Sequence, residues 1–483
     1  MNEKAIYWGR VEADGSPVII RRNLFWEHAH ILGNSGSGKS SMRLAPLAEQ
    51  TIGFGDTSLI LIELKADKRE NLAACIAAQT ELKNRTGNEV PIRVFTIESG
   101  KASHVFNPFQ TSGFKDVSLA DKISLITEPL SLFYGVVYGP GHYSAKNAET
   151  IRECLIANPS IDSFHQLYCT LLEQAADPST YIGSQHRNDY VHVANTIWSL
   201  ASCSVLNVTR TSGHAPEVLD NQIDLAAAFQ TPGIYYFHLP TVTSPFVAQT
   251  IGRLVVKYLL IAAKYATRKV RVQVVIDEFQ RMIADNLEVV FQQARGHDIS
   301  LVLANQSLSD LRACGPVLLS AIEGNCAIRQ WLSVTTADDI AHLAKLFGTR
   351  KEYAETVTES ARGRSVSSTL RDEPRITTTD LHRISSDPFL SVTKINCERG
   401  GYAQYRGVPF VVRNQFHISK EEYKRRLEFE WPVDLLGLTE VSELPLPPTP
   451  RPAEKKARGG RRGGPFKGPS DKPDRPPLDD LFT

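Results

Sequence analysis

Three separate stretches of this chain carry residue types that together could bind and hydrolyse a nucleoside triphosphate. The first, residues 33–40, has the pattern G-x-x-x-x-G-K-S and follows the apolar run 29–32. Glycines allow backbone N–H groups to surround a phosphate, and the helix that follows adds its positive end. We expect Lys39 to reach the β- and γ-phosphates and Ser40 to contact Mg²⁺. The predicted nucleotide-binding residues of this Walker A loop are Gly33, Asn34, Ser35, Gly36, Ser37, Gly38, Lys39, Ser40 and Ser41.

The second stretch is an acidic pair, Asp277 and Glu278, which directly follows the apolar run 272–276. Phosphoryl transfer to water requires both a metal ion and an oriented nucleophile. We expect Asp277 to hold the Mg²⁺ ion and Glu278 to polarise the attacking water. The alternative is an ordinary strand end with two solvated acids. The Walker A loop upstream favours the hydrolytic interpretation, in which this pair is a Walker B motif.

The third stretch is a predicted helix and strand that end in Arg295 and Gln306, respectively. Gln306 could contact the γ-phosphate or the attacking water, or it could be a helix cap or a surface residue. Arg295 could stabilise the transition state at a neighbouring subunit's nucleotide, or it could be a solvated arginine at a helix end. Glu63 and Lys65 end a further apolar run. They face the ligand if the sheet is an open α/β sheet, and otherwise they are solvated charges.

The composition is that of an ordinary globular protein. The chain has 483 residues, of which 42% are hydrophobic and 22% charged, with a net charge of +1. Its seven cysteines are scattered without a C-x-x-C pair, which favours reduced thiols in the cytosol over a disulfide scaffold or a zinc site. No apolar run reaches about 18 residues, and the first residues lack a signal core. We therefore expect a cytoplasmic protein with no membrane span.

The order of elements predicts an α/β fold with a mainly parallel sheet. A hairpin is expected over residues 4–22, a last helix from the capping box 419–422, and a long polar loop over 350–379. Other strands are expected at 29–32, 58–65, 92–96, 233–240, 272–276, 299–304, 326–331, 391–396, 403–405 and 409–412.

Helical spacing without strand runs sets residues 113–228 apart, and we interpret them as an all-α insertion. The ATPase domain would then comprise residues 1–112 and 229–438. Residues 439–483 are rich in Pro, Gly, Lys and Arg and end in an acidic, apolar tip, so a disordered tail is predicted. Arginines in this tail could bind nucleic acid, or the tail could be a solubilising linker.

The ordered set of motifs resembles the TraG/TraD-type conjugative coupling proteins of type IV secretion, within the FtsK/HerA class of P-loop ATPases. The resemblance rests on residues 33–40, 59–65, 107–109, 274–279, 295–296, 304–307, 346–348 and 379–381, together with the position of the helical insertion. It implies a RecA-like motor that binds ATP and Mg²⁺, forms a homo-hexamer and moves DNA through a central channel. It also implies that Arg295 is an arginine finger and Gln306 a sensor of the γ-phosphate.

One departure from the family concerns the membrane. Members usually begin with membrane-spanning helices, whereas this chain starts directly at the predicted hairpin. We therefore expect either a cytoplasmic protein that could reach the inner membrane through a relaxase or secretion-system partner, or a soluble relative that acts on DNA elsewhere. Two other functions stay open: a secretion ATPase whose helical insertion recognises protein substrates, and a nucleotide-gated scaffold without turnover.

Overall fold

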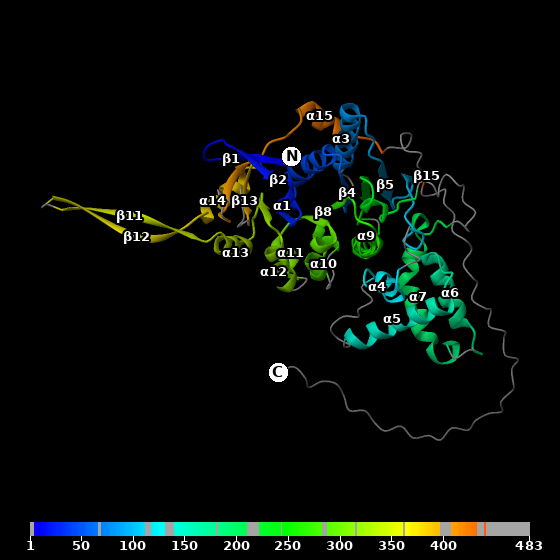
Figure 1. Cartoon of the computed structure of the whole chain (residues 1–483). Coiled ribbons are helices and arrows are strands. Elements are labelled where there is room, and N and C mark those ends of the chain that lie inside the picture. The colour runs from blue at the N-terminus through cyan, green and yellow to red at the C-terminus, as the bar shows by residue number, and fades with distance from the viewer. Residues whose placement is uncertain are drawn as a thin grey trace, which may run out of the picture.

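The computed structural model describes residues 4–65, 69–111, 117–130, 140–179, 182–209, 222–242, 244–282, 287–313, 316–360, 363–396, 407–431 and 439–440. Its centre is an eleven-stranded sheet (Figure 1) in the order β2-β1-β14-β13-β10-β3-β9-β8-β4-β7-β5. Seven neighbouring strands are parallel: β10 (Ile328–Trp331), β3 (Ala29–Leu32), β9 (Ile299–Asn305), β8 (Arg271–Asp277), β4 (Thr57–Glu63), β7 (Ile234–His238) and β5 (Ile92–Thr96).

The other four strands extend the sheet in antiparallel fashion on one side. They are β13 (Leu390–Ile395), β14 (Phe410–Arg413), β1 (Ala5–Val11) and β2 (Pro17–Arg21). The predicted N-terminal hairpin and the mainly parallel sheet are therefore confirmed. The strand predicted at 403–405 lies outside the described residues.

Both faces of the parallel strands are covered, which explains their uninterrupted apolar runs. On β4, Leu59 and Leu61 pack into a cluster with α2 (Ala45–Gly53) and α3 (Glu70–Thr86). Ile60 and Ile62 point to the other face and join a cluster with α9 (Pro245–Tyr265) and α10 (Leu287–Ala294). Figure 1 shows α3 and α15 (Lys420–Leu427) on one side of the sheet and α9 and α10 on the other.

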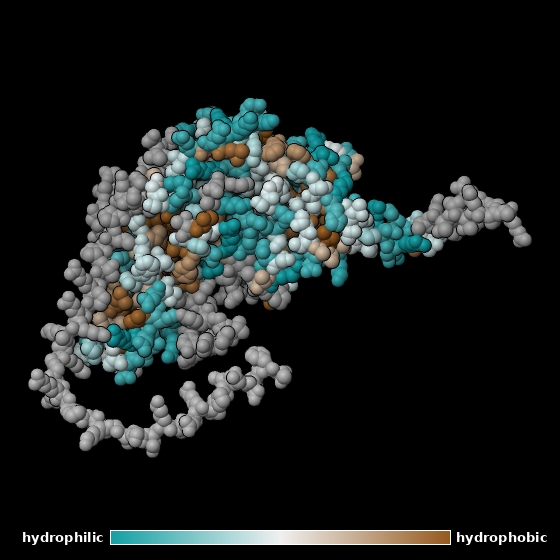
Figure 2. Space-filling view, turned by 180° about the vertical axis from the view of Figure 1, so that it is seen from behind, coloured by the Kyte–Doolittle hydropathy of each residue, from teal (hydrophilic) through white to brown (hydrophobic). Residues whose placement is uncertain are grey.

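Helix α9 is the one helix among the described residues that is long and apolar enough to cross a membrane. In this fold 72% of its apolar window is buried inside the protein. Its Lys257 pairs with Glu128 at 2.6 Å. The surface seen from behind is mostly hydrophilic, with hydrophobic side chains in separate patches (Figure 2). Helix α9 is therefore a core helix of this fold.

Between residues 113 and 228, the described part of the chain holds helices and no strand. The main ones are α4 (Leu119–Thr127), α5 (Pro140–Ala157), α6 (Phe164–Ala176) and α7 (Arg187–Ala201). Their apolar faces join the same core cluster as the α9 face of the sheet, and Phe109 and Phe164 meet edge to face with ring centroids 5.0 Å apart. The predicted boundaries of the insertion stay predictions.

The prediction of a long loop over residues 350–379 is wrong. The structure has a two-stranded ribbon there, β11 (Thr349–Ser360) paired with β12 (Gly363–Pro374), which extends from the body (Figure 1). The strands pair only with each other, so they carry no core-facing apolar alternation. Opposite charges in register replace it, at Arg350↔Glu373, Lys351↔Asp372 and Glu352↔Arg371.

The capping box predicted at the start of the last helix forms only in part. Ser419 caps α15 by accepting from the Glu422 N–H at 3.2 Å, but the Glu422 carboxylate pairs with Arg425 and Arg426, so only half of the predicted capping box forms. Outside residues 113–228, the further α-helices and strands are α1 (Arg22–Phe25), α11 (Leu308–Ala313), α12 (Pro316–Asn325), α13 (Ala337–Phe347), α14 (Thr378–Ser386), and β6 (Ala102–Ser103) paired with β15 (Thr439–Glu440). The tail after residue 440, predicted to be disordered, lies outside the described residues.

Buried histidines should make the fold sensitive to acid. Burial lowers the pKa of His28, His30 and His104 to about 4. His28 is held neutral, because its Nδ1 accepts from the Leu301 N–H while its Nε2 donates to the Phe291 carbonyl. The unfolded chain binds protons below about pH 6.5 and the folded chain does not, so the free energy of unfolding falls between about pH 6.5 and pH 4.

We expect a loss of roughly 3 kcal/mol for each of these histidines across that window. Urea unfolding followed by tryptophan fluorescence at a series of pH values measures it. The variant His30→Gln, which keeps an amide donor toward Asn305, should lose less stability in acid than the wild type. An equal loss in both proteins would contradict the role given to His30.

Candidate active site

Four neighbouring strands bring the predicted site residues to one edge of the sheet. In the order β3-β9-β8-β4, their carboxyl ends lead into the Walker A loop, Gln306, the acidic pair at 277–278, and Lys65. Carboxyl ends of parallel strands share an edge, and ligands bind outside it in open α/β sheets. Segments more than 200 residues apart in the sequence therefore form one site.

The Walker A loop needs its glycines. A Cβ at Gly33 would lie 2.5 Å from Ser37 Oγ and 3.1 Å from Leu332 Cβ, so no side chain fits between the loop and the strand end beside it. Gly38 has φ +82°, a conformation that other residues rarely adopt. The tip of the loop, formed by Ser35 and Gly36, is exposed. The loop therefore presents bare backbone to the edge of the sheet.

Polar side chains of the loop are held from three directions. Lys39 is buried, and its Nζ donates to the carbonyl oxygens of Gly33 and, at 3.2 Å, Asn34. Asn34 Nδ2 donates to Thr335 Oγ1 at 2.9 Å, which ties the loop to the segment after β10. Ser41 is hydrogen-bonded to Tyr423 of α15. Helical structure begins at Ser40, as predicted, with a π-helical turn (Ser40–Leu44).

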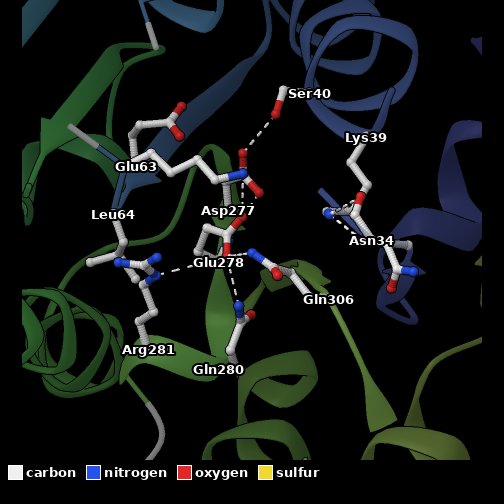
Figure 3. Close-up of polar contacts among 12 residues, drawn as sticks. Asn34, Lys39, Ser40, Glu63, Leu64, Asp277, Glu278, Gln280, Arg281 and Gln306 are labelled. Atoms are coloured by element: carbon white, nitrogen blue, oxygen red, sulfur yellow. Dashed lines mark hydrogen bonds and ion pairs between the residues drawn. The ribbon is translucent and has the colours of Figure 1, made fainter. Parts of the chain in front are cut away.

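Ser40 and Asp277 are adjacent across the strands. Ser40 Oγ donates to Asp277 Oδ2 at 2.8 Å, and the Glu278 N–H donates to Asp277 Oδ1 at 2.9 Å (Figure 3). Asp277 is fully buried. The described residues contain no group of three or more His, Cys, Asp or Glu side chains that could hold a metal by themselves. One serine and one carboxylate fit Mg²⁺, which is usually bound through one or two carboxylates plus substrate phosphates.

Glu63 lies opposite Asp277 in the register of β4 and β8 and is completely buried. Burial, with the charge of Asp277 beside it, raises the pKa of Glu63 well above its usual range. Asn71 Nδ2 donates to Glu63 Oε2 at 2.7 Å. Of the two interpretations of this strand end, solvated charges are therefore wrong for Glu63.

The carboxylate of Glu278 is the most densely contacted group of the site. Its Oε2 accepts from Gln280 Nε2 at 2.6 Å and from Gln306 Nε2 at 2.7 Å, and Arg281 Nε lies 3.8 Å from the same oxygen (Figure 3). Its Oε1 forms an ion pair with Lys65 Nζ. Burial acts to raise the pKa of Glu278, but the hydrogen bond and charge of Lys65 outweigh it, so the pKa is lowered. The two solvated acids considered as an alternative are absent, since both Asp277 and Glu278 are fully buried.

The structure places Arg295 and Gln306 at opposite ends of strand β9. Gln306 Nε2 donates to Glu278 Oε2 at 2.7 Å, and its role as a sensor of the γ-phosphate stays a prediction. Arg295 instead begins the 3₁₀ turn Arg295–His297, just before the first residue of β9. It therefore lies at the opposite edge of the sheet, about 20 Å of strand away. Its side chain is 65% exposed and pairs with Glu27 at 3.1 Å.

Sequence reasoning missed three of the partners of Glu278. Gln280 and Arg281 lie in the 3₁₀ turn Phe279–Met282 directly after the acidic pair, and their polar character within D-E-F-Q-R was a usable signal. Lys65 was noted at a strand end, but its partner was not predicted. Contact between Lys65 and Glu278 depends on β4 and β8 being neighbours, which the sequence does not state.

Comparison with known proteins gives this arrangement a context. A family model described as the TraM recognition site of TraD and TraG matches residues 271–386, which contain the acidic pair, Arg295, Gln306 and the β11–β12 ribbon. The fold is similar to that of the bacterial conjugative coupling protein TrwBΔN70 in its unbound form. That match has 12% identity and a TM-score of 0.57, and covers 85% of this chain and 89% of the other. The resemblance to TraG/TraD-type coupling proteins is confirmed.

Two further structures share the TraG/TraD-type fold. TrwB in complex with the non-hydrolysable ATP analogue ADPNP is 14% identical, with a TM-score of 0.55 and coverage of 85% of this chain and 90% of TrwB. VirB4 of Thermoanaerobacter pseudethanolicus is 12% identical, with a TM-score of 0.52 and coverage of 87% and 98%. This shared fold confirms the predicted α/β class with a mainly parallel central sheet. No curated protein sequence matches the chain.

Proposed function

We propose that this protein is an ATP-hydrolysing coupling protein that forms a hexameric ring and moves DNA toward a secretion channel. The observation that carries the proposal is the convergence of the Walker A loop, Asp277, Glu278 and Gln306 at one edge of the sheet. A site that only bound nucleotide would not need the ionised carboxylate of Glu278, nor the side-chain amide of Gln306 that holds it. The fold it shares with TrwB and VirB4 supports the same class of motor.

The roles of the residues follow from their contacts. Backbone N–H groups of residues 33–38 and the Lys39 ammonium bind the phosphates, and Ser40 and Asp277 hold Mg²⁺, which neutralises phosphate charge when bound. Glu278 accepts a proton from the attacking water. Gln306 Nε2 turns from Glu278 Oε2 toward the γ-phosphate, which leaves a lone pair of that oxygen free for the water.

The proposed role of Arg295 is to act on the nucleotide of a second subunit. At the far edge of the sheet it cannot reach the nucleotide of its own chain, while its exposed guanidinium can reach that of a neighbour. An arginine supplied in this way stabilises the charge of the transition state and can raise turnover by about 10³-fold or more. We therefore assign it as an arginine finger acting in trans in a homo-hexamer.

The partners and location follow from the family resemblance. DNA is the proposed cargo, and the tail after residue 440 is the proposed additional nucleic-acid contact. The all-α insertion at 113–228 is proposed as a separate recognition domain. A relaxase or a membrane component of a secretion system would bring this cytoplasmic ATPase to the inner membrane. The region that matches the TraM recognition site of TraD and TraG supports docking to such a partner.

The test is ATP hydrolysis by the full chain with no DNA, with single-stranded DNA and with duplex DNA. We expect ATP turnover to rise several-fold with either single-stranded or duplex DNA. The form that stimulates turnover is the one along which the protein moves. Assembly state is measured in the same samples by light scattering. Turnover indifferent to DNA, with protein substrates retained by the chain, would favour the protein-secretion alternative. Nucleotide binding without turnover under every condition would favour the scaffold.

A further inference from the structure

One oxygen of the proposed general base is fully occupied by amide partners. Each oxygen of a carboxylate offers about two lone-pair sites. On Glu278, both sites of Oε2 are taken by the amides of Gln280 and Gln306, and Oε1 is paired with the Lys65 ammonium. Oε2 can therefore accept from water only after one of its two amide partners leaves. The remaining partners then decide where the carboxylate points.

Gln306 is the partner whose departure fits the proposed function, because it ends the strand next to the Walker A strand. Its departure frees Oε2 and leaves Oε1 in contact with Lys65. Lys65 is itself largely buried, with 18% of its side chain exposed, at the end of the strand next to β8. Burial acts to lower its pKa, but the hydrogen bond to Glu278 and the nearby carboxylates leave the pKa raised, so it stays charged.

The backbone of Glu278 makes its side chain depend on such contacts. Glu278 has φ +59°, in the left-handed region, which is strained for a residue with a Cβ. Such a conformation persists only where surrounding interactions fix it. The ion pair with Lys65 is the one contact on Oε1 among the described residues, and its loss would leave a buried charged oxygen without a partner.

We propose that Lys65 is a positioning residue for Glu278. The inference rests on the proposed function, in which Glu278 is the base. Lys65 holds Oε1 and so aims Oε2 at the water. It touches neither the phosphates nor the water, and it acts through Glu278 alone.

The experiment compares Lys65→Met with Lys65→Arg, which keeps the charge. In Lys65→Met we expect kcat for ATP to fall roughly 10- to 100-fold with KM and the Kd of ATP unchanged, since proton transfer by a positioned group contributes about 10²–10⁴-fold. Lys65→Arg should recover most of the rate. Lys101→Met is the matched control, because Lys101 is a similarly buried lysine paired with Glu98 at 2.6 Å outside the site, and its kcat should be that of the wild type.

A double variant separates positioning from general damage to the fold. Adding Lys65→Met to Glu278→Gln should lower the residual rate no further, because residues that act as a unit are not additive. A further drop, an unchanged or raised kcat in Lys65→Met, or a changed KM would overturn the proposal. Absence of ATP hydrolysis by the wild-type protein would instead refute the proposed function. In that case a crystal structure of Lys65→Met tests the positioning role by itself. A Glu278 carboxylate in the same place as in the wild type would contradict that role.

Discussion

Replacing Glu278 by glutamine is expected to reduce ATP turnover roughly 10³-fold while leaving the Kd of ATP nearly unchanged. The amide keeps the size of the side chain and can still contact Gln280 and Gln306, but it cannot take a proton from water. Steady-state hydrolysis with the stimulating DNA, together with titration of a fluorescent ATP analogue, measures both quantities. A variant that keeps more than about a tenth of the wild-type rate would refute Glu278 as the base.

The same variant also tests the trans role of Arg295. Glu278→Gln subunits retain a normal Arg295, and Arg295→Ala subunits retain a normal Glu278. If the arginine acts across subunits, mixing the two inactive proteins creates some interfaces that have both groups, and turnover returns. Arg268→Ala is the control, since Arg268 is a partly exposed arginine that pairs with Asp298 at 3.0 Å near the same edge. Absence of recovery in mixed assemblies would contradict the assignment.

Replacing Lys39 by alanine is expected to raise the Kd of ATP roughly 100-fold, a loss of about 3 kcal/mol, because each hydrogen bond from a charged donor is worth about 1.5–3 kcal/mol. In this structure the Nζ of Lys39 donates to two loop carbonyls, at Gly33 and Asn34. In the nucleotide complex, phosphate oxygens would take their place. Isothermal titration with ATP, alongside thermal unfolding, separates lost binding from lost fold.

Two outcomes would count against this role for Lys39. One is an unchanged Kd in Lys39→Ala, which would mean that the ammonium does not contact phosphate. The other is an equal loss in Lys83→Ala, a control in which an exposed lysine loses only its surface pair with Glu89. Exposed pairs contribute about 0–1 kcal/mol to stability, so the control should behave as the wild type.

The fold could be predicted wherever a strand is covered on both faces. β4 and β8 appear in the sequence as unbroken apolar runs because each face meets helices, and the Walker A pattern marks the edge at which they end. The ribbon β11–β12 could not be predicted in this way, since its strands contact no core. Its signal was the opposite charges at Arg350 and Glu373, which have meaning only once the register is known.

The site could be predicted as a set of residue types but not as a set of contacts. Ser40 with Asp277 followed from the chemistry of Mg²⁺, and the hydrogen bond between Gln306 and Glu278 agreed with the expected roles. The ion pair of Lys65 with Glu278 depends on strand order, which short-range patterns do not encode. The remote position of Arg295 has the same origin, because an exposed helix end gives no indication of which edge of the sheet it occupies.

The ribbon β11–β12 has a consequence for how the chain can be altered. Its first and last residues, Thr349 and Pro374, are paired in register, and the Arg375 N–H donates to the Gly348 carbonyl at 3.0 Å. The two ends are therefore about 5 Å apart, a gap that a two-residue turn can close. We therefore expect that the whole ribbon, about 40 Å of paired strand, can be excised without opening the eleven-stranded sheet. A chain shortened in this way keeps every residue of the candidate site, and any activity that it loses depends on the ribbon.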